Sequence, residues 1–101
     1  MGELIAARHA ADGSYVDVIR YAAGLHLEPH AHDFTTVSLV LRGRLREDAG
    51  ESRVRAEAFD LVVKPRATRH ENLFLAEGTT LVQVAPARET LRRAAEAGCP
   101  V

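Results

Sequence analysis

The sequence lacks the features that mark cross-linked, membrane-spanning or exported proteins. Its 101 residues include one cysteine, Cys99, so no disulfide can form within the chain. Hydrophobic runs are only a few residues long, which excludes a membrane-spanning helix. The first residues also lack the basic region and the apolar run of a signal peptide. We therefore expect a cytoplasmic protein without a membrane partner, stabilised by its hydrophobic core.

An excess of charge of either sign is also missing. Thirteen basic and fourteen acidic side chains leave a formal net charge of -1 at pH 7. Nonspecific nucleic-acid binding and polybasic membrane contact both need a basic excess, so neither is expected. Hydrophobic residues make up 47% of the chain, enough for a globular core. The length suits one domain, which we predict to span residues 1–101.

What the sequence does contain is a series of short strands separated by turn signals. The expected strands cover residues 4–9, 15–22, 34–42, 44–48, 52–56, 61–64, 70–75 and 80–85. Asp12-Gly13 and Ala49-Gly50-Glu51 read as hairpin turns, and Glu77-Gly78 reads as a turn between the last two strands. Short strands at regular spacing predict an all-β sandwich or barrel, here from about residue 3 to residue 85.

The last segment has a different pattern. Pro86 suits the first turn of a helix, and residues 87–97 are good helix formers. Gly98 and Pro100 end this segment, so we predict a short C-terminal α-helix at about residues 86–97. Its apolar stripe is narrow, which favours docking on the sheet over a separate dimerisation helix.

His30 and His32 are the first chemically informative pair among the five histidines. Two residues apart on an extended segment, they point to the same face, roughly 6–7 Å from each other along the chain. Two imidazoles on one face can bind a metal when another strand supplies a third ligand. His70, which follows Pro65 and begins a strand, is the predicted third ligand. The alternative is that these are ordinary histidines of a partly polar interior.

Side-chain alternation extends the histidine face along the neighbouring strands. It places neutral hydrogen-bonding groups and apolar groups in the same cavity, a mixture that suits recognition of a small molecule. The predicted ligand-binding residues are Phe34, Thr36, Ser38, Asn72 and Phe74. Asp33 and Glu71 have the opposite parity and are expected on the surface. Arg42, Arg44 and Arg46 alternate on one face, either to hold an anion or as a solvated strand surface.

The two histidine segments resemble the two sequence motifs of the cupin superfamily. Pro29-His30-Ala31-His32 followed by Gly43 is similar to the first motif, and Pro65-Arg66-Ala67-Thr68-Arg69-His70 is similar to the second. The resemblance covers roughly residues 15–85. It implies a double-stranded β-helix, a jelly-roll-like barrel, with a metal bound inside. Within the superfamily, the strands around both motifs resemble the N-terminal sensor domain of AraC-type transcriptional regulators.

The sequence departs from the superfamily at the carboxylate ligand. The first motif usually supplies a glutamate four or five residues after its second histidine, and these positions hold Thr36 and Val37 here. Ala67 also stands where the second motif usually has a glycine. Three histidines completed by water remain suitable for Zn, Ni, Fe, Mn or Cu. We therefore predict a divalent transition metal at His30, His32 and His70, with its identity and occupancy open.

Three functions are compatible with these features. The first is a barrel that binds a small molecule, like an AraC-type sensor domain but without a DNA-binding segment in this chain. The second is a metal-dependent enzyme of the oxygenase or isomerase type. The third is a barrel that only mediates association. The first is preferred, because no acid–base residue is expected inside the cavity, and turnover normally needs one.

A homodimer is the predicted assembly. The strand at residues 34–42 carries apolar side chains on both faces, with Val37, Leu39 and Leu41 on the side away from the cavity. A strand face exposed to water is normally polar, so something must cover this one. The alternative to a second copy is the C-terminal helix.

Overall fold

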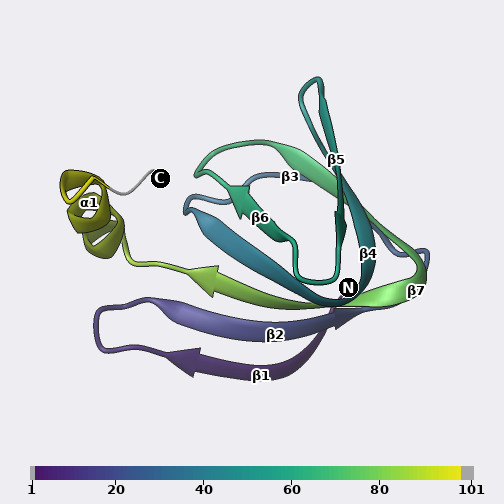
Figure 1. The fold of residues 1–101 in the computed structure, drawn as a ribbon, viewed down its shortest axis with the longest axis horizontal. Helices are drawn as coiled ribbons and strands as arrows, with labels where there is room; N and C mark the ends of the chain where they lie inside the picture. The colour runs from purple at the N-terminus through teal and green to yellow at the C-terminus, as the bar shows by residue number, and fades with distance from the viewer. Residues whose placement is uncertain (1, 99–101) are drawn as a thin grey trace.

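The computed structural model describes residues 2–98, and Cys99 lies outside them. These residues form a mostly β structure with one helix at the C-terminal end (Figure 1). The elements are β1 (Glu3–His9), β2 (Tyr15–Tyr21), β3 (His26–His30), β4 (Thr36–Ala49), β5 (Ser52–Glu57), β6 (Leu61–Lys64), β7 (His70–Ala85) and α1 (Arg88–Glu96). The predicted fold class is confirmed. The described helix is too short to cross a bilayer.

Two strands are longer than the sequence predicts. Where separate strands are expected at residues 34–42 and 44–48, and again at 70–75 and 80–85, the structure has the single strands β4 and β7. Each bends at a glycine with positive φ, Gly43 (φ 85°) and Gly78 (φ 73°). Such a glycine can bend a strand without ending its hydrogen-bond ladder. The pairing of β4 with β7 therefore continues through both bends, with register shifts on either side of Gly43.

The two bent strands connect two halves of a curled antiparallel sheet. Beyond the bends, the second half of β7 pairs with β2 and with the first half of β4, while β6 and β1 lie at the edges. The first half of β7 pairs with β3 and with the second half of β4, which also pairs with β5. Figure 1 shows the resulting half-barrel, with β3, β5 and β6 curled over the opposite side from β1 and β2.

The interior of this half-barrel is apolar at one end and polar at the other. The apolar cluster is formed by Val40, Leu45, Ala56, Val62, Phe74 and Leu81. Along β4, Thr36 and Ser38 continue the same inward face, and both are 1% exposed. Along β7, Asn72 and His70 do the same. The core thus supports a buried polar region near the start of β4 and β7.

The C-terminal helix stands at the end of the barrel and does not cover the outer sheet face. Its start is held by the turn between β1 and β2: Ala87 donates its N–H to the hydroxyl of Ser14 (2.8 Å), and Thr90 donates to Asp12 (2.6 Å). None of its described residues is fully buried. The expected docking of its apolar stripe on the sheet is therefore only partial, with Leu91 and Ala94 half-buried. The helix lies away from the outer face of β4, so it is not the element that covers this face, as the alternative to a homodimer required (Figure 1).

Candidate metal site

The three predicted histidines lie together at the polar end of the barrel. His30 ends β3 and is paired in register with His70, the first residue of β7. His32 lies in the loop after β3, and its carbonyl oxygen accepts a hydrogen bond from the Ala67 N–H (2.8 Å), which ties this loop to the β6–β7 turn. One nitrogen from each imidazole lies within 4.8 Å of those of the other two. The fold thus brings two sequence-distant segments to a single point.

Hydrogen bonds to backbone carbonyls set the orientation of two of these rings. His30 Nδ1 lies 2.7 Å from the Glu28 carbonyl oxygen, and His70 Nδ1 lies 3.0 Å from the Thr68 carbonyl oxygen. A carbonyl oxygen can only accept, so Nδ1 is the protonated nitrogen in each neutral ring. Each Nε2 then carries a free lone pair. This is the arrangement that orients histidine ligands of metals in proteins.

Burial favours the neutral form of His32 and His70. The pKa of His32 is lowered by burial first and then by the neighbouring His30, His70 and Lys64. The pKa of His70 is lowered mainly by burial, against a smaller opposing effect of its bond to the Thr68 carbonyl. Both rings are therefore mostly neutral at pH 7, the state that binds a metal.

His70 provides a direct test of whether a metal suits this site. Its side chain is 3% exposed, and its Nε2 atom has no hydrogen-bond partner within the described residues. A buried polar atom without a partner costs free energy unless water, an ion or a ligand satisfies it. With two further imidazole nitrogens within 4.8 Å, a transition metal fits the set of donors.

The predicted ligand-binding residues occupy two different environments. Thr36, Ser38 and Asn72 are buried on the inward face, and the hydroxyl groups of Thr36 and Ser38 have no partner in the described structure. Phe34 is half-buried and stacks on His32, with ring centroids 5.1 Å apart. Phe74 instead packs in the core, where it stacks on Tyr21 at 4.0 Å.

The sequence analysis missed a carboxylate inside the barrel. Glu47 on β4 is 7% exposed, and its Oε1 atom accepts a hydrogen bond from Asn72 Nδ2 (2.9 Å). The same oxygen forms an ion pair with Lys64 Nζ at 3.2 Å. Strict alternation from Thr36 places residue 47 outside, but the irregularities around Gly43 reverse the parity of β4. The expectation that no acid–base group lies in the interior is therefore wrong.

The surface acids lie where alternation places them. Asp33 is 89% exposed and faces Arg88 at 3.5 Å. Glu71 accepts from His26 Nε2 at 2.8 Å, so His26 has a partner that the sequence did not suggest. Among the three alternating arginines, Arg44 pairs with Glu77, which favours the solvated strand surface over an anion site.

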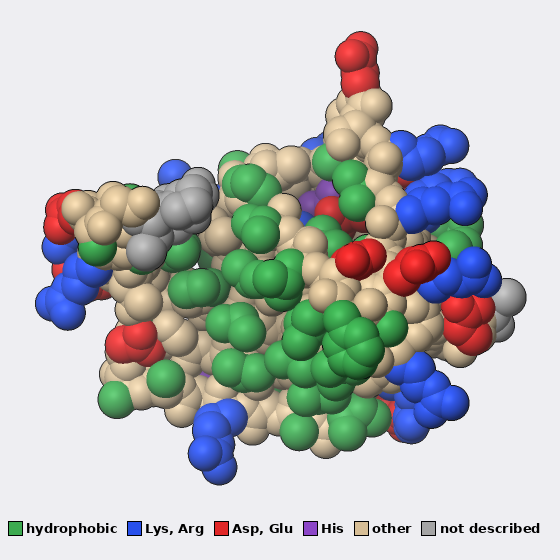
Figure 2. Space-filling model, in the orientation of Figure 1, with side chains coloured by type: hydrophobic (Ala, Val, Ile, Leu, Met, Phe, Trp, Pro, Cys, Tyr) green, Lys and Arg blue, Asp and Glu red, His purple; other side chains and the backbone are tan. Residues whose placement is uncertain are grey.

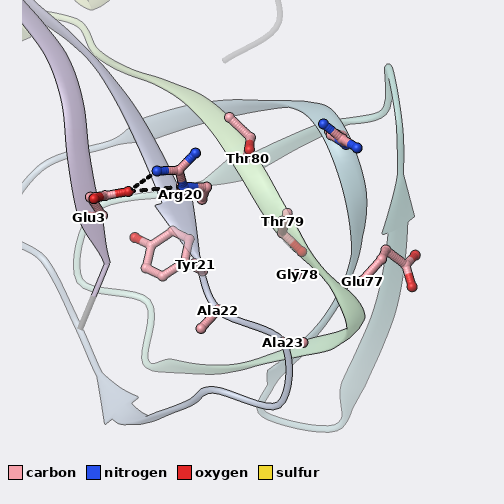
Figure 3. Close-up of a pocket in the computed structure, with 10 residues that line it drawn as sticks. Glu3, Arg20, Tyr21, Ala22, Ala23, Glu77, Gly78, Thr79 and Thr80 are labelled. Carbon is pink, nitrogen blue, oxygen red and sulfur yellow. Dashed lines mark hydrogen bonds and ion pairs between the residues drawn. The ribbon is translucent and has the colours of Figure 1, made fainter.

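A pocket of about 490 Å³ lies away from the histidines, near the Gly78 bend (Figure 3). Arg20 lines it and is paired with Glu3, another lining residue. Thr80 lies between Arg20 and the neighbouring strand β4, while Tyr21 borders the pocket from β2. Among the described residues that line this pocket, none has a buried polar atom that, like His70 Nε2, lacks a hydrogen-bond partner.

Residues 3–87 match a known protein family, the ChrR cupin-like domain. Solved structures with the same fold include a protein of unknown function from Rhizobium leguminosarum (TM-score 0.73, 21% identity, 84% of this chain and 78% of that one). A KdgF from Halomonas sp. is also similar (TM-score 0.68, 20% identity, 89% of this chain and 82% of that one). A third similar structure is that of a cupin 2 conserved barrel domain protein from Salinispora arenicola (TM-score 0.71, 17% identity, 95% of this chain and 82% of that one). No curated protein matches the sequence.

Proposed function

The chain belongs to the ChrR cupin-like domain family of the cupin superfamily, and from this premise we propose that it binds one divalent metal and a small molecule inside its barrel. His30, His32 and His70 would hold the metal, which is Zn, Ni, Fe, Mn or Cu. The convergence of three imidazole nitrogens within 4.8 Å carries this proposal. A metal held by three neutral histidines keeps open positions and acts there as a Lewis acid.

The ligand would occupy the polar end of the barrel beside the histidines. The hydroxyl groups of Thr36 and Ser38 and the amide of Asn72 offer hydrogen bonds there, and Phe34 offers an apolar ring next to His32. This mixture favours binding over a reaction of one particular type. The similarity to AraC-type sensor domains and the cytoplasmic location remain predictions of the sequence.

A metal-dependent enzyme of the oxygenase or isomerase type is the second candidate function. Glu47 favours it, because a buried carboxylate inside the barrel is a group that can accept a proton. Its Oε1 atom is already shared by Asn72 and Lys64, which argues for a structural or ligand-positioning role. Binding therefore stays the preferred function.

Substitution of one triad histidine tests the metal site. Wild-type protein reconstituted with Zn²⁺ is expected to retain about one ion per chain, and His30→Ala is expected to weaken binding by more than about 100-fold. His9→Ala, which removes an exposed histidine of β1, should leave binding unchanged. Elemental analysis after gel filtration and competition with a chromophoric chelator provide the measurement. Equal Zn²⁺ binding by His30→Ala and the wild type would disprove the site.

Oxygen consumption tests the oxygenase form of the second candidate function. Protein loaded with Fe²⁺ is expected to leave dissolved oxygen unchanged in the presence of small organic acids. Uptake that requires both His30 and Glu47 would reverse the ranking and establish the enzyme.

We also propose that the outer face of the sheet binds a second copy of the chain. Two apolar rows cross this face in register: Leu61, Leu39, Val82 and Val18 in one, and Val63, Val37, Val84 and Val16 in the other. Leu61 is 65% and Val63 is 54% exposed. Figure 2 shows hydrophobic side chains across the middle of one face, with most charged side chains at its margin. A face of neutral rows is self-complementary, as a two-fold interface requires.

The mass in solution tests this interface. Light scattering at tens of micromolar is expected to give a dimer for the wild type and a monomer for Leu61→Asp. Leu4→Asp is the matched control, because Leu4 is 61% exposed and pairs with Ile19, outside the two apolar rows. A monomeric wild type, or a Leu61→Asp dimer as stable as the wild type, would contradict the proposed interface.

A further inference from the structure

The barrel contains a buried ion pair that the metal site does not use. Lys64 is the only lysine of the chain, and it ends β6. Its side chain is 12% exposed, and Nζ lies 3.2 Å from Glu47 Oε1. An ammonium group has three protons to donate, and a buried ion pair is costly unless further hydrogen bonds satisfy it. The pair with Glu47 is the one contact that the described structure gives this group.

Two buried hydroxyl groups next to Lys64 also have no partner. Thr36 is directly opposite Lys64 in the β4–β6 register, and Ser38 is two residues further along β4 on the same face. Both are 1% exposed, and neither Oγ1 of Thr36 nor Oγ of Ser38 makes a hydrogen bond within the described residues. Native proteins satisfy nearly all buried polar atoms, so unpaired groups on the same face indicate a place for a ligand.

This group of polar atoms lies beside the histidine triad. Glu47 Oε1, which pairs with Lys64, also accepts a hydrogen bond from Asn72, and Asn72 lies two residues from His70 on the same inward face of β7. Glu47, Lys64 and His70 also line one pocket of about 150 Å³. Sites for drug-sized molecules measure roughly 300–1,000 Å³, so this pocket accepts only a small ligand.

The charge balance determines the sign of that ligand. Lys64 and Glu47 neutralise each other, and histidine binds a metal as the neutral imidazole. A divalent ion at the triad would therefore leave about two positive charges uncompensated in a partly buried site. Buried charges are stable only when they are paired, so an anion is the ligand that this site favours.

We propose that the interior binds a small carboxylate, with Lys64 and the hydroxyl groups of Thr36 and Ser38 holding its oxygens beside the metal site. This inference rests on the proposed function, because the metal supplies the net positive charge. The planar carboxylate fits donors on one face of two paired strands, β4 and β6. Lys64 is then the residue that determines specificity, and Glu47 positions it.

Titration of the Co²⁺-loaded protein with acetate tests the proposal, with the visible absorption of Co²⁺ as the readout. Addition of acetate is expected to shift the Co²⁺ spectrum of the wild type, and Lys64→Met is expected to weaken acetate binding at least tenfold. Glu47→Gln frees the ammonium group from its carboxylate partner, so it should tighten acetate binding. Lys64→Arg should restore part of the affinity, because it restores the charge.

Two further variants control for folding and for general charge effects. Arg55→Met removes one exposed positive charge from β5 and should leave acetate binding unchanged. The double variant Lys64→Met/Glu47→Gln removes both buried charges, so it should bind Co²⁺ and still fail to bind acetate. This outcome is expected even where Lys64→Met alone does not fold.

The outcomes of this experiment separate the two proposals. Failure of the wild type to bind Co²⁺ would overturn the metal site and the carboxylate site together. Binding of Co²⁺ with a spectrum that acetate does not change would overturn the carboxylate site alone. So would equal acetate affinity in the wild type and the double variant. Binding of inorganic phosphate as tightly as acetate would replace the carboxylate assignment with a general anion site.

Discussion

Replacement of Gly43 by alanine is expected to remove a large share of the stability of the fold. Gly43 has φ 85°, and an added Cβ atom would lie 1.8 Å from the Gly78 carbonyl oxygen. The obstructing atom belongs to the backbone of the paired strand, so the clash cannot be relieved by a side-chain rotation. A positive φ alone costs a non-glycine residue roughly 1–3 kcal/mol. With the clash, we expect a loss of at least about 4 kcal/mol, a large share of a typical stability of about 5–15 kcal/mol.

Gly50→Ala is the matched control for backbone strain. Gly50 also has positive φ (59°), but its added Cβ atom would meet no other atom within 4 Å. Its cost should therefore be that of the backbone conformation alone, about 1–3 kcal/mol. Urea unfolding followed by far-ultraviolet circular dichroism measures both variants. Equal losses for Gly43→Ala and Gly50→Ala would show that β4 and β7 separate at their bends without cost.

The same contact explains which parts of the fold the sequence could predict. Hairpins and short strands depend on local turn residues, and the predicted strand at residues 61–64 coincides with β6. Gly43 and Gly78 give the same local signal as a turn, although the strands continue through them. Only the pairing of β4 with β7, which joins residues far apart in the sequence, decides between a bend and an end.

The sequence likewise predicts the parts of the candidate site that depend on local spacing, but not those that depend on the bend of β4. The two motifs locate His30, His32 and His70, and alternation correctly places Thr36 and Ser38 on the inward face. Glu47 could not be found in this way, because the parity changes at the Gly43 bend, beyond which Leu45 and Glu47 point inward. The ion pair of Glu47 with Lys64 also depends on the bend of β4, because Glu47 lies in the second half of β4 while Lys64 lies on β6, which pairs with the first half. Sequence spacing does not contain this information.

Introduction of a glutamate at residue 36 is expected to strengthen metal binding and to weaken the metal-free protein. Thr36 occupies the position where the first cupin motif usually carries its carboxylate ligand, and it is buried on the same inward face as the polar end of the barrel. A carboxylate at this position would complete a set of three imidazoles and one carboxylate. We expect Thr36→Glu to bind Zn²⁺ at least about tenfold more tightly than the wild type, measured by competition with a chelator.

Without metal, the same substitution should lower the melting temperature. Residue 36 is 1% exposed, and burial of a carboxylate is costly even with Lys64 directly opposite. A ligand at 100 times its dissociation constant stabilises the folded state by about 2.7 kcal/mol. For a chain of this size, each 1 kcal/mol changes the melting temperature by roughly 4–8 °C. The increase in melting temperature on addition of Zn²⁺ should therefore be larger for Thr36→Glu than for the wild type.

Ser38→Glu separates metal ligation from the general effect of a buried negative charge. Ser38 is also 1% exposed and lies on the same face of β4, two residues further from the histidine loop and opposite Val62. Ser38→Glu should destabilise the metal-free protein at least as much as Thr36→Glu does, but it should not tighten Zn²⁺ binding. If both variants gain the same Zn²⁺ affinity, the gain is electrostatic and residue 36 has no special position relative to the triad. A gain confined to Thr36→Glu requires a carboxylate within reach of the metal, because charge alone would act from both positions.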